Sequence, residues 1–324
     1  MAKEFEIRTD LALEEKESFP GDGGEIHGVS LKEWQDKGGN FKITEVVVLD
    51  EEGARAMGKP VGTYMTLEAK NLKWREKEYH TALAKELARQ IERLMRRQCI
   101  GEDGNILVVG LGNEAVTPDS LGPRVVSQLR ISRHLKKKYR QEMFGSGRSV
   151  SALVPGVMAQ TGMETAEIIR GVVQETKPDM VLVIDALAAR SVRRLGNTIQ
   201  LSDTGISPGS GVGNHRSAIT EEVLGIPVLA VGVPTVVGAA AIAHDTVGAL
   251  IQVLNREQIT QNIGQYIENM DPEEQYAFIR EILDPEFGSM YVTEPDIDET
   301  IRQLGMLISD GIHRAVYPED EREG

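Results

Sequence analysis

Short apolar runs separated by polar and glycine-rich turns recur through the middle of the chain. They cover residues 106–109, 150–154, 180–184 and 227–231, and each is followed by a glycine, a proline or an aspartate. Apolar runs of this length, interrupted here only by Ser151, are typical of strands buried on both faces of a sheet. Helical patterns lie between them, so the stretch from about 105 to 255 predicts a parallel, doubly wound sheet with right-handed crossovers.

A helical spacing of apolar residues is clearest before the first of these runs. Leu83, Leu87, Ile91 and Leu94 recur at intervals of three and four, which predicts a helix over residues 79–98 with one buried face. Similar patterns predict further helices over the residues that follow Asp119 and over 162–175, 187–195 and 239–254.

The two ends of the chain have a different composition. Residues 1–39 are rich in charge and glycine, which predicts weak structure. Residues 41–50 and 62–70 are typical of strands, and we expect them to form a small appended sheet. Residues 256–324 are acidic with helical patterning, and 318–324 are expected to form a disordered tail. The overall expectation is a three-layer α/β/α fold with a mostly parallel sheet and a helical C-terminal region.

Composition and charge narrow the class of protein. Apolar residues make up 40 % of the chain but aromatic residues only 5 %, so aliphatic side chains and alanine must fill the core. The formal net charge is −14, which argues against direct binding of nucleic acid, because contact with phosphate backbones needs surplus Lys and Arg. The single cysteine, Cys99, excludes a disulfide within the chain and favours a reducing, cytoplasmic compartment.

The sequence shows no sign of a membrane protein. The first twenty residues are charged throughout and lack the apolar core of a secretory signal. Elsewhere the longest apolar runs are far shorter than a bilayer span. We therefore expect no association with a membrane.

Two aspartates stand where predicted strands end. Asp119 follows the strand over 106–109 after a short loop, and Asp185 directly follows the run over 180–184. In an open α/β sheet, ligands bind in the crevice outside the carboxyl ends of the strands. Of two carboxyl groups sharing such a crevice, the ionised one can take a proton from water and the protonated one can donate to a substrate carbonyl oxygen. The alternative is that each aspartate only caps the helix after it.

The glycine-rich stretch over residues 204–216 suggests a different chemistry that we reject. Gly205, Ser207 and Gly209 match the G-x-S-x-G pattern of serine hydrolases. However, the residue after that serine must donate a backbone N–H, and Pro208 has none. The stretch also lacks the Gly-Lys-Ser/Thr ending of a phosphate-binding loop, and the glycines after residue 109 are an incomplete dinucleotide fingerprint.

The candidate crevice has further expected members, and a metal remains an open alternative. The residues that we expect to line the crevice or to bind substrate are Gly112, Asn113, Gly156, Ser210 and His215. No pair of histidines has the spacing of a zinc protease. We expect no cofactor, although Asp119, Asp185 and a histidine could together hold a divalent metal ion.

The same segments carry a family resemblance. The matching motifs are GLGN at 110–113, TPDSLG at 117–122, PGVM at 155–158, KPD at 177–179, IDALAAR at 184–190, SPGSGVGN at 207–214 and GVPTVV at 232–237. With RTDLA at 8–12, these motifs resemble the germination protease of spore-forming bacteria. Its fold is similar to that of hydrogenase maturation proteases, in which the equivalent acidic positions contact nickel.

This resemblance implies an endopeptidase of aspartic type that degrades small acid-soluble spore proteins during germination. Asp119 and Asp185 match the catalytic aspartates of the family. The resemblance also implies a homotetramer in the spore core, made as a zymogen that trims its own N-terminus. The matching cleavage site lies between Asp10 and Leu11, in a segment that we expect to be accessible. The chain would then divide into a propeptide, 1–10, and one peptidase domain, 11–324.

Within that domain the expected parts are 11–104, with N-terminal strands and a helix, the core sheet over 105–255, and the helical part over 256–324. Two other functions stay open. One is a metal-dependent endopeptidase that uses the same acidic pair as ligands. The other is a non-enzymatic binder of the proteins that coat spore DNA, which would bind substrate without releasing new fragments.

Overall fold

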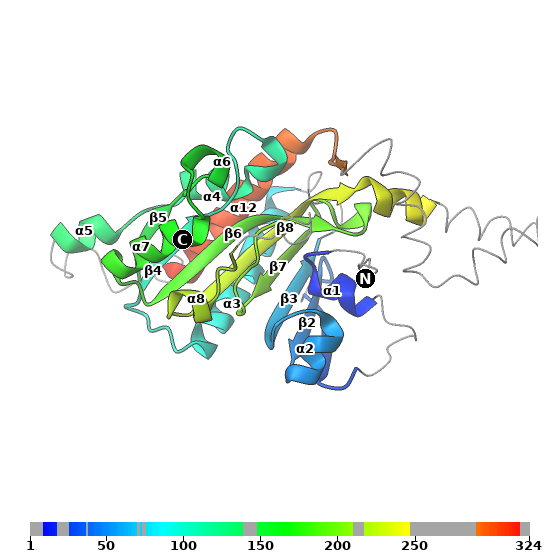
Figure 1. Cartoon of the computed structure of the whole chain (residues 1–324), viewed down its shortest axis with the longest axis horizontal. Coiled ribbons are helices and arrows are strands. Elements are labelled where there is room, and N and C mark those ends of the chain that lie inside the picture. Colours follow the sequence, from blue (N-terminus) through cyan, green and yellow to red (C-terminus); the bar gives the residue numbers. More distant parts are fainter. Residues whose placement is uncertain are drawn as a thin grey trace, which may run out of the picture.

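The structure is a computed structural model of the whole chain (Figure 1). It describes residues 9–17, 26–36, 38–69, 72, 76–138, 148–209, 217–246 and 290–317. Its strands are β1 (Val29–Gln35), β2 (Lys42–Val48), β3 (Gly62–Glu68), β4 (Asn105–Gly110), β5 (Ser149–Leu153), β6 (Met180–Ala189), β7 (Thr198–Ser202), β8 (Val228–Gly238) and β9 (Tyr291–Val292).

The described helices surround these strands. They are α1 (Ala12–Glu17), α2 (Glu51–Met57), α3 (Lys77–Arg97), α4 (Leu121–Ser127), α5 (Arg133–Lys138), α6 (Met158–Thr161), α7 (Thr165–Thr176), α8 (Glu221–Leu224) and α12 (Ile297–Val316). Two short 3₁₀ helices are η2 (Thr117–Asp119) and η4 (Val192–Arg194). Residues 239–246 are also helical, in agreement with the first half of the predicted 239–254 helix.

One mixed sheet of nine strands forms the centre of the fold. Its order is β1-β2-β3-β7-β8-β6-β4-β5, with β9 beside β8. The four strands β5, β4, β6 and β8 are parallel, which confirms the predicted α/β class with its parallel core. The N-terminal strands are antiparallel and continue this same sheet through the β3–β7 pairing, so the appended part is not a separate sheet.

Helices cover both faces of the sheet, as Figure 1 shows. On one face, α3, α4 and α12 pack on alternate strand residues such as Ile106, Val108 and Leu182. On the other face, α7 and α8 pack on the intervening residues, among them Leu107 and Val183. Successive side chains of a strand point to opposite faces, so strands covered on both sides are apolar throughout.

Two expectations from the sequence were wrong. The predicted helix over 187–195 is instead the end of β6, which continues to Ala189, followed by η4. The apolar run simply continues past Asp185, and periodicity alone cannot distinguish a buried strand from a helix there. Residues 1–39 are also not uniformly weak in structure, because α1 and β1 are both ordered parts of the fold.

Several predicted features lie outside the described residues. These are the stretch over 247–289, the tail over 318–324 and the second half of the loop over 204–216. Among the residues that are described, no helix is both long enough and apolar enough to cross a bilayer.

The packing of α12 gives a first testable prediction. Ile308 of α12 is fully buried, whereas Met306 on the same helix is 44 % exposed. Ile308→Ala should lower the free energy of unfolding by about 2–5 kcal/mol, because it removes buried methyl groups and leaves a cavity. Met306→Ala should change it by less than about 1 kcal/mol. Urea unfolding of the two variants measures both effects, and equal losses would contradict the described burial of α12.

Candidate active site

The loop that follows β4 is shaped by glycine. Leu111 continues the strand by donating its N–H to the carbonyl oxygen of Ile184 in β6, at 2.8 Å. Gly112 then has a φ of +112°, and a Cβ at this position would lie 1.9 Å from the backbone oxygen of Asp119. Only glycine allows the chain to approach Asp119 this closely.

Asp119, in η2, is held against this loop. The backbone N–H of Asn113 donates to both the backbone oxygen and Oδ2 of Asp119, at 3.0 and 2.9 Å. The side chain of Asn113 in turn accepts a hydrogen bond from Gln160 in α6, at 3.1 Å. Gly156 belongs to the same region, since a Cβ there would lie 3.0 Å from Oε1 of Gln160. The structure thus brings Gly112, Asn113, Gly156 and Asp119 together.

Asp185 is a buried carboxylate within β6, with an exposed fraction of 6 %. Its Oδ1 accepts from the backbone N–H of Ala186, at 2.9 Å. Alternation along the strand places Asp185 on the same face as Val183, which packs beneath α7 and α8, and as Leu187. Asp185 is therefore inside a strand, which corrects the prediction that it directly follows a strand over 180–184.

Both aspartates lie near the carboxyl end of β4. Gly110, the last residue of β4, pairs with Ile184, the residue before Asp185. The η2 turn that carries Asp119 contacts both β6 and β8. Parallel pairing of β4 with β6 therefore brings two acids that are far apart in the sequence to one region of the sheet. The other two expected crevice residues, Ser210 and His215, lie outside the described residues.

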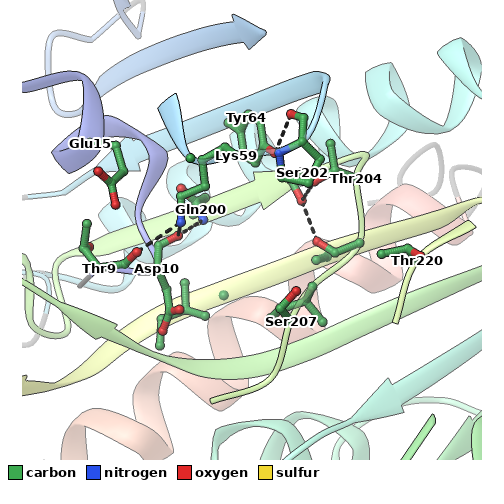
Figure 2. Close-up of a pocket in the computed structure, with 17 residues that line it drawn as sticks. Thr9, Asp10, Glu15, Lys59, Tyr64, Gln200, Ser202, Thr204, Ser207 and Thr220 are labelled. Atoms are coloured by element: carbon green, nitrogen blue, oxygen red, sulfur yellow. Dashed lines mark hydrogen bonds between the residues drawn. The ribbon is translucent and has the colours of Figure 1, made fainter. Parts of the chain in front are cut away.

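A cavity of about 320 Å³ opens beside this region (Figure 2). Hydroxyl groups of Tyr64, Ser202, Thr204, Ser207 and Thr220 line it, and Lys59 supplies an ammonium group. Its lining includes neither Asp119 nor Asp185. The predicted crevice and the cavity are therefore neighbours and not one space.

The pairing of β6, β8 and β7 places Asp185 in line with two residues of the cavity wall. Asp185 pairs with Gly232 of β8, and Gly232 pairs with Gln200 of β7, so the three residues form one row across the sheet. Gly232 has no side chain, and a Cβ there would lie 2.4 Å from Leu187. The side chain of Leu187 therefore lies over Gly232, between Asp185 and Gln200. Gln200 and Gly232 line the cavity and were not predicted, because long-range strand pairing leaves no local pattern in a sequence.

The predicted processing site is packed into this region. Leu11 is fully buried in a small cluster with Leu187, Ala189, Leu195, Val237 and Ala241. Asp10 donates its backbone N–H to the carbonyl oxygen of Ala188, at 3.0 Å, and its Oδ2 accepts from the N–H of Ala188, at 2.9 Å. The expectation of an accessible, disordered segment is therefore wrong, because residues 9–13 are apolar enough to dock beside the end of β6.

Glu14 anchors this segment to the turn after β6. Its carboxylate accepts from the backbone N–H groups of Arg190 and Ser191, at 2.7 and 3.0 Å, and from the hydroxyl of Thr9. Burial raises the pKa of the Glu14 carboxyl above its ordinary value of 4.5, although these donors and the charge of Arg194 act in the opposite direction. Glu14 was not singled out from the sequence, where it is one acid among many.

Among the described residues, no three His, Cys, Asp or Glu side chains gather as they would to hold a metal ion. The fold and site thus define an α/β protein that carries two carboxylates near the carboxyl end of β4, with a docked segment of its own chain on β6. The sequence profile of the germination protease family matches residues 6–265. The chain belongs to this family, and it is a protease.

Curated relatives match over nearly their whole length. The chain is 50 % identical to the germination protease of Caldanaerobacter subterraneus subsp. tengcongensis over 314 residues, which cover 96 % of this chain and 94 % of that protein. It is 42 % identical to the germination protease of Clostridium tetani, with 98 % and 97 % covered, and 37 % identical to that of Priestia megaterium, with 99 % and 96 % covered.

Substitution of Gly112 tests the loop that holds Asp119. Gly112→Ala should lower the free energy of unfolding by about 1–3 kcal/mol, because the new Cβ meets the Asp119 backbone and the backbone conformation favours glycine. Gly171→Ala in α7 is the matched control, because a Cβ there meets nothing within 4 Å and alanine favours a helix. A Gly112→Ala chain as stable as the control in urea unfolding would contradict the described contact.

The raised pKa of Glu14 makes docking of residues 9–13 depend on pH. The Glu14 carboxyl binds its proton more tightly when residues 9–13 are docked, so protonation of Glu14 stabilises the docked state. This contribution to docking is complete below pH 4.5 and is lost as pH rises through the raised pKa. Amide exchange at Leu11, corrected for its intrinsic pH dependence, should show falling protection as pH rises from about 4.5. Glu14→Gln should flatten this dependence, and the exposed Glu175→Gln should not. Identical slopes in all three chains would contradict the account.

Proposed function

We propose that this chain is an aspartic-type endopeptidase that starts the breakdown of small acid-soluble spore proteins in germinating spores. Asp119 and Asp185 are its catalytic residues. The observation that carries the proposal is the parallel pairing of β4 with β6, which brings two acids matching the family's catalytic pair to one region of the sheet. Membership of the germination protease family supports the same conclusion.

The chemistry requires two carboxyl groups in different protonation states. The ionised carboxylate takes a proton from a water molecule as the water attacks the carbonyl carbon of the peptide bond. The protonated carboxyl donates to the carbonyl oxygen, and a proton then passes to the leaving nitrogen as the bond breaks. Asp185 is buried, whereas Asp119 is more exposed to solvent. This difference is consistent with different protonation states of the two carboxyl groups.

The enzyme is made as a zymogen that cuts its own chain between Asp10 and Leu11. The bond follows an acidic residue, Asp10, and precedes a bulky apolar and a small residue, Leu11 and Ala12. The family resemblance implies the same pattern at the bonds that the enzyme cuts in its substrates. Docking of this segment beside the row of Asp185, Gly232 and Gln200 supports self-cleavage within the folded chain.

The remaining parts of the proposal concern the setting of the enzyme. It works as a homotetramer in the spore core, without a cofactor, without direct contact with nucleic acid and without a membrane. The net charge of −14 supports substrates that are themselves proteins and not the DNA that they coat.

Replacing either aspartate tests the proposed chemistry. Asp119→Asn and Asp185→Asn should each lower the rate of substrate cleavage by about 10²–10⁴-fold, because asparagine cannot carry the proton. The measurement is release of peptide fragments from a purified small acid-soluble spore protein, with the exposed Asp103→Asn as control. Wild-type rates in both variants would refute the assignment.

The same assay distinguishes the two other functions. Strong chelation should leave cleavage unchanged, whereas loss of activity on chelation and its return with added metal would favour a metal-dependent peptidase. Binding of the spore protein without any new fragment would favour a non-enzymatic binder.

A further inference from the structure

The carbonyl group of Asp10 has two side-chain donors. Nε2 of Gln200 donates to its oxygen at 3.1 Å, and Nζ of Lys59 donates to it at 3.3 Å (Figure 2). Lys59 also donates to the preceding carbonyl, that of Thr9, at 3.0 Å. This is the carbonyl of the bond that the proposed function has the enzyme cut, so two donors, one of them charged, already point at the oxygen on which negative charge would develop.

The atoms on both sides of that bond are fixed as well. Oε1 of Gln200 accepts from the N–H of Ala12 at 2.7 Å, so one amide side chain holds the chain before and after the bond. The N–H of Leu11, the nitrogen that would leave, donates to the hydroxyl of Thr9 at 3.1 Å. The buried side chain of Leu11 and the pairing of Asp10 with Ala188 complete the arrangement.

The surroundings give the bond space for water, and Asp185 lies on the same row of the sheet as Gln200. Asp10, Lys59 and Gln200 all line the cavity of about 320 Å³, which has room for several water molecules. Gln200 lies two strands from Asp185, which corresponds to about 10 Å between their backbones. Gly232, the residue between them, has no side chain, and the side chain of Leu187 lies over it.

We propose that Lys59 and Gln200 are catalytic residues of the self-cleavage, as the donors that stabilise the oxyanion formed at the Asp10 carbonyl. The inference rests on the proposed function, in which Asp119 and Asp185 supply the base and the acid. Water adds to the carbonyl carbon and gives one proton to the ionised carboxylate. The carbonyl oxygen becomes an anion held by Lys59 and Gln200. In the self-cleavage the protonated carboxyl therefore gives its proton to the leaving nitrogen and not to the carbonyl oxygen. The bond to nitrogen breaks, and the products are a new C-terminal carboxylate at Asp10 and the Leu11 amine.

Isosteric variants of the full-length chain test the role of the two donors. Lys59→Met keeps the aliphatic stem and removes the ammonium group. Gln200→Glu keeps an acceptor for the Ala12 N–H and replaces the donor with a second oxygen. Each should slow self-cleavage by about 100-fold or more, the usual effect of losing one oxyanion donor. The measurement is the appearance over time of the chain that begins at Leu11, by intact mass. Lys85→Met, on the exposed side of α3, is the matched control.

A second readout separates catalysis from docking. Amide exchange at Leu11 and Ala12 reports whether residues 9–13 stay bound in each variant. Slow cleavage with protection retained supports the inference. Cleavage at the wild-type rate overturns it, and so does slow cleavage that is matched by an equal loss of protection, because the donors would then only hold the segment.

The outcome for Asp185→Asn keeps this inference distinct from the proposed function. Suppose that the wild-type chain cuts itself after Asp10 and Asp185→Asn does not. Self-cleavage at the wild-type rate in Lys59→Met and Gln200→Glu would then refute the oxyanion role and leave the proposed function standing. If Asp185→Asn cuts as fast as the wild type, the proposed function itself fails.

Discussion

The parallel pairing of β4 with β6 is the constraint on which the rest of the site depends. It sets Gly110 opposite Ile184, so that the loop carrying Asp119 begins where β6 is about to reach Asp185. Beyond that point β6 continues and offers the backbone groups of Ala188 to Asp10. One strand therefore carries the buried Asp185 and, a few residues later, holds the segment that contains the proposed cleavage site.

Residues without side chains make this crowding possible. Gly112 lets the backbone and carboxylate of Asp119 approach the loop after β4, and Gly232 leaves room for the side chain of Leu187 between Asp185 and Gln200. Gly232 and Leu187 both line the cavity. Polar groups that approach a buried peptide bond need such space, because interiors are otherwise packed as densely as crystals.

The sequence predicts the core of the fold well because buried parallel strands are continuous apolar runs. The runs before Gly110, Asp185 and Gly232 all lie in strands, and the Gly-rich turn before Asp119 has the expected shape. The extension of β6 was missed because its apolar residues continue without a turn signal. The contacts of Lys59 and Gln200 with residues 9–12 were missed because they join residues far apart in the sequence, 188 residues in the case of Gln200 and Ala12. The charge of residues 1–17 likewise concealed the buried Leu11.

The central claim is that Asp119 and Asp185 act as one catalytic unit. A double-mutant cycle tests it most directly, by comparing the cleavage rates of the wild-type chain, Asp119→Asn, Asp185→Asn and the double variant on one spore protein. Residues that act as a unit give strongly non-additive losses, so the double variant should be about as slow as the slower single variant. Losses that multiply would mean that the two carboxylates act independently, and would contradict the account.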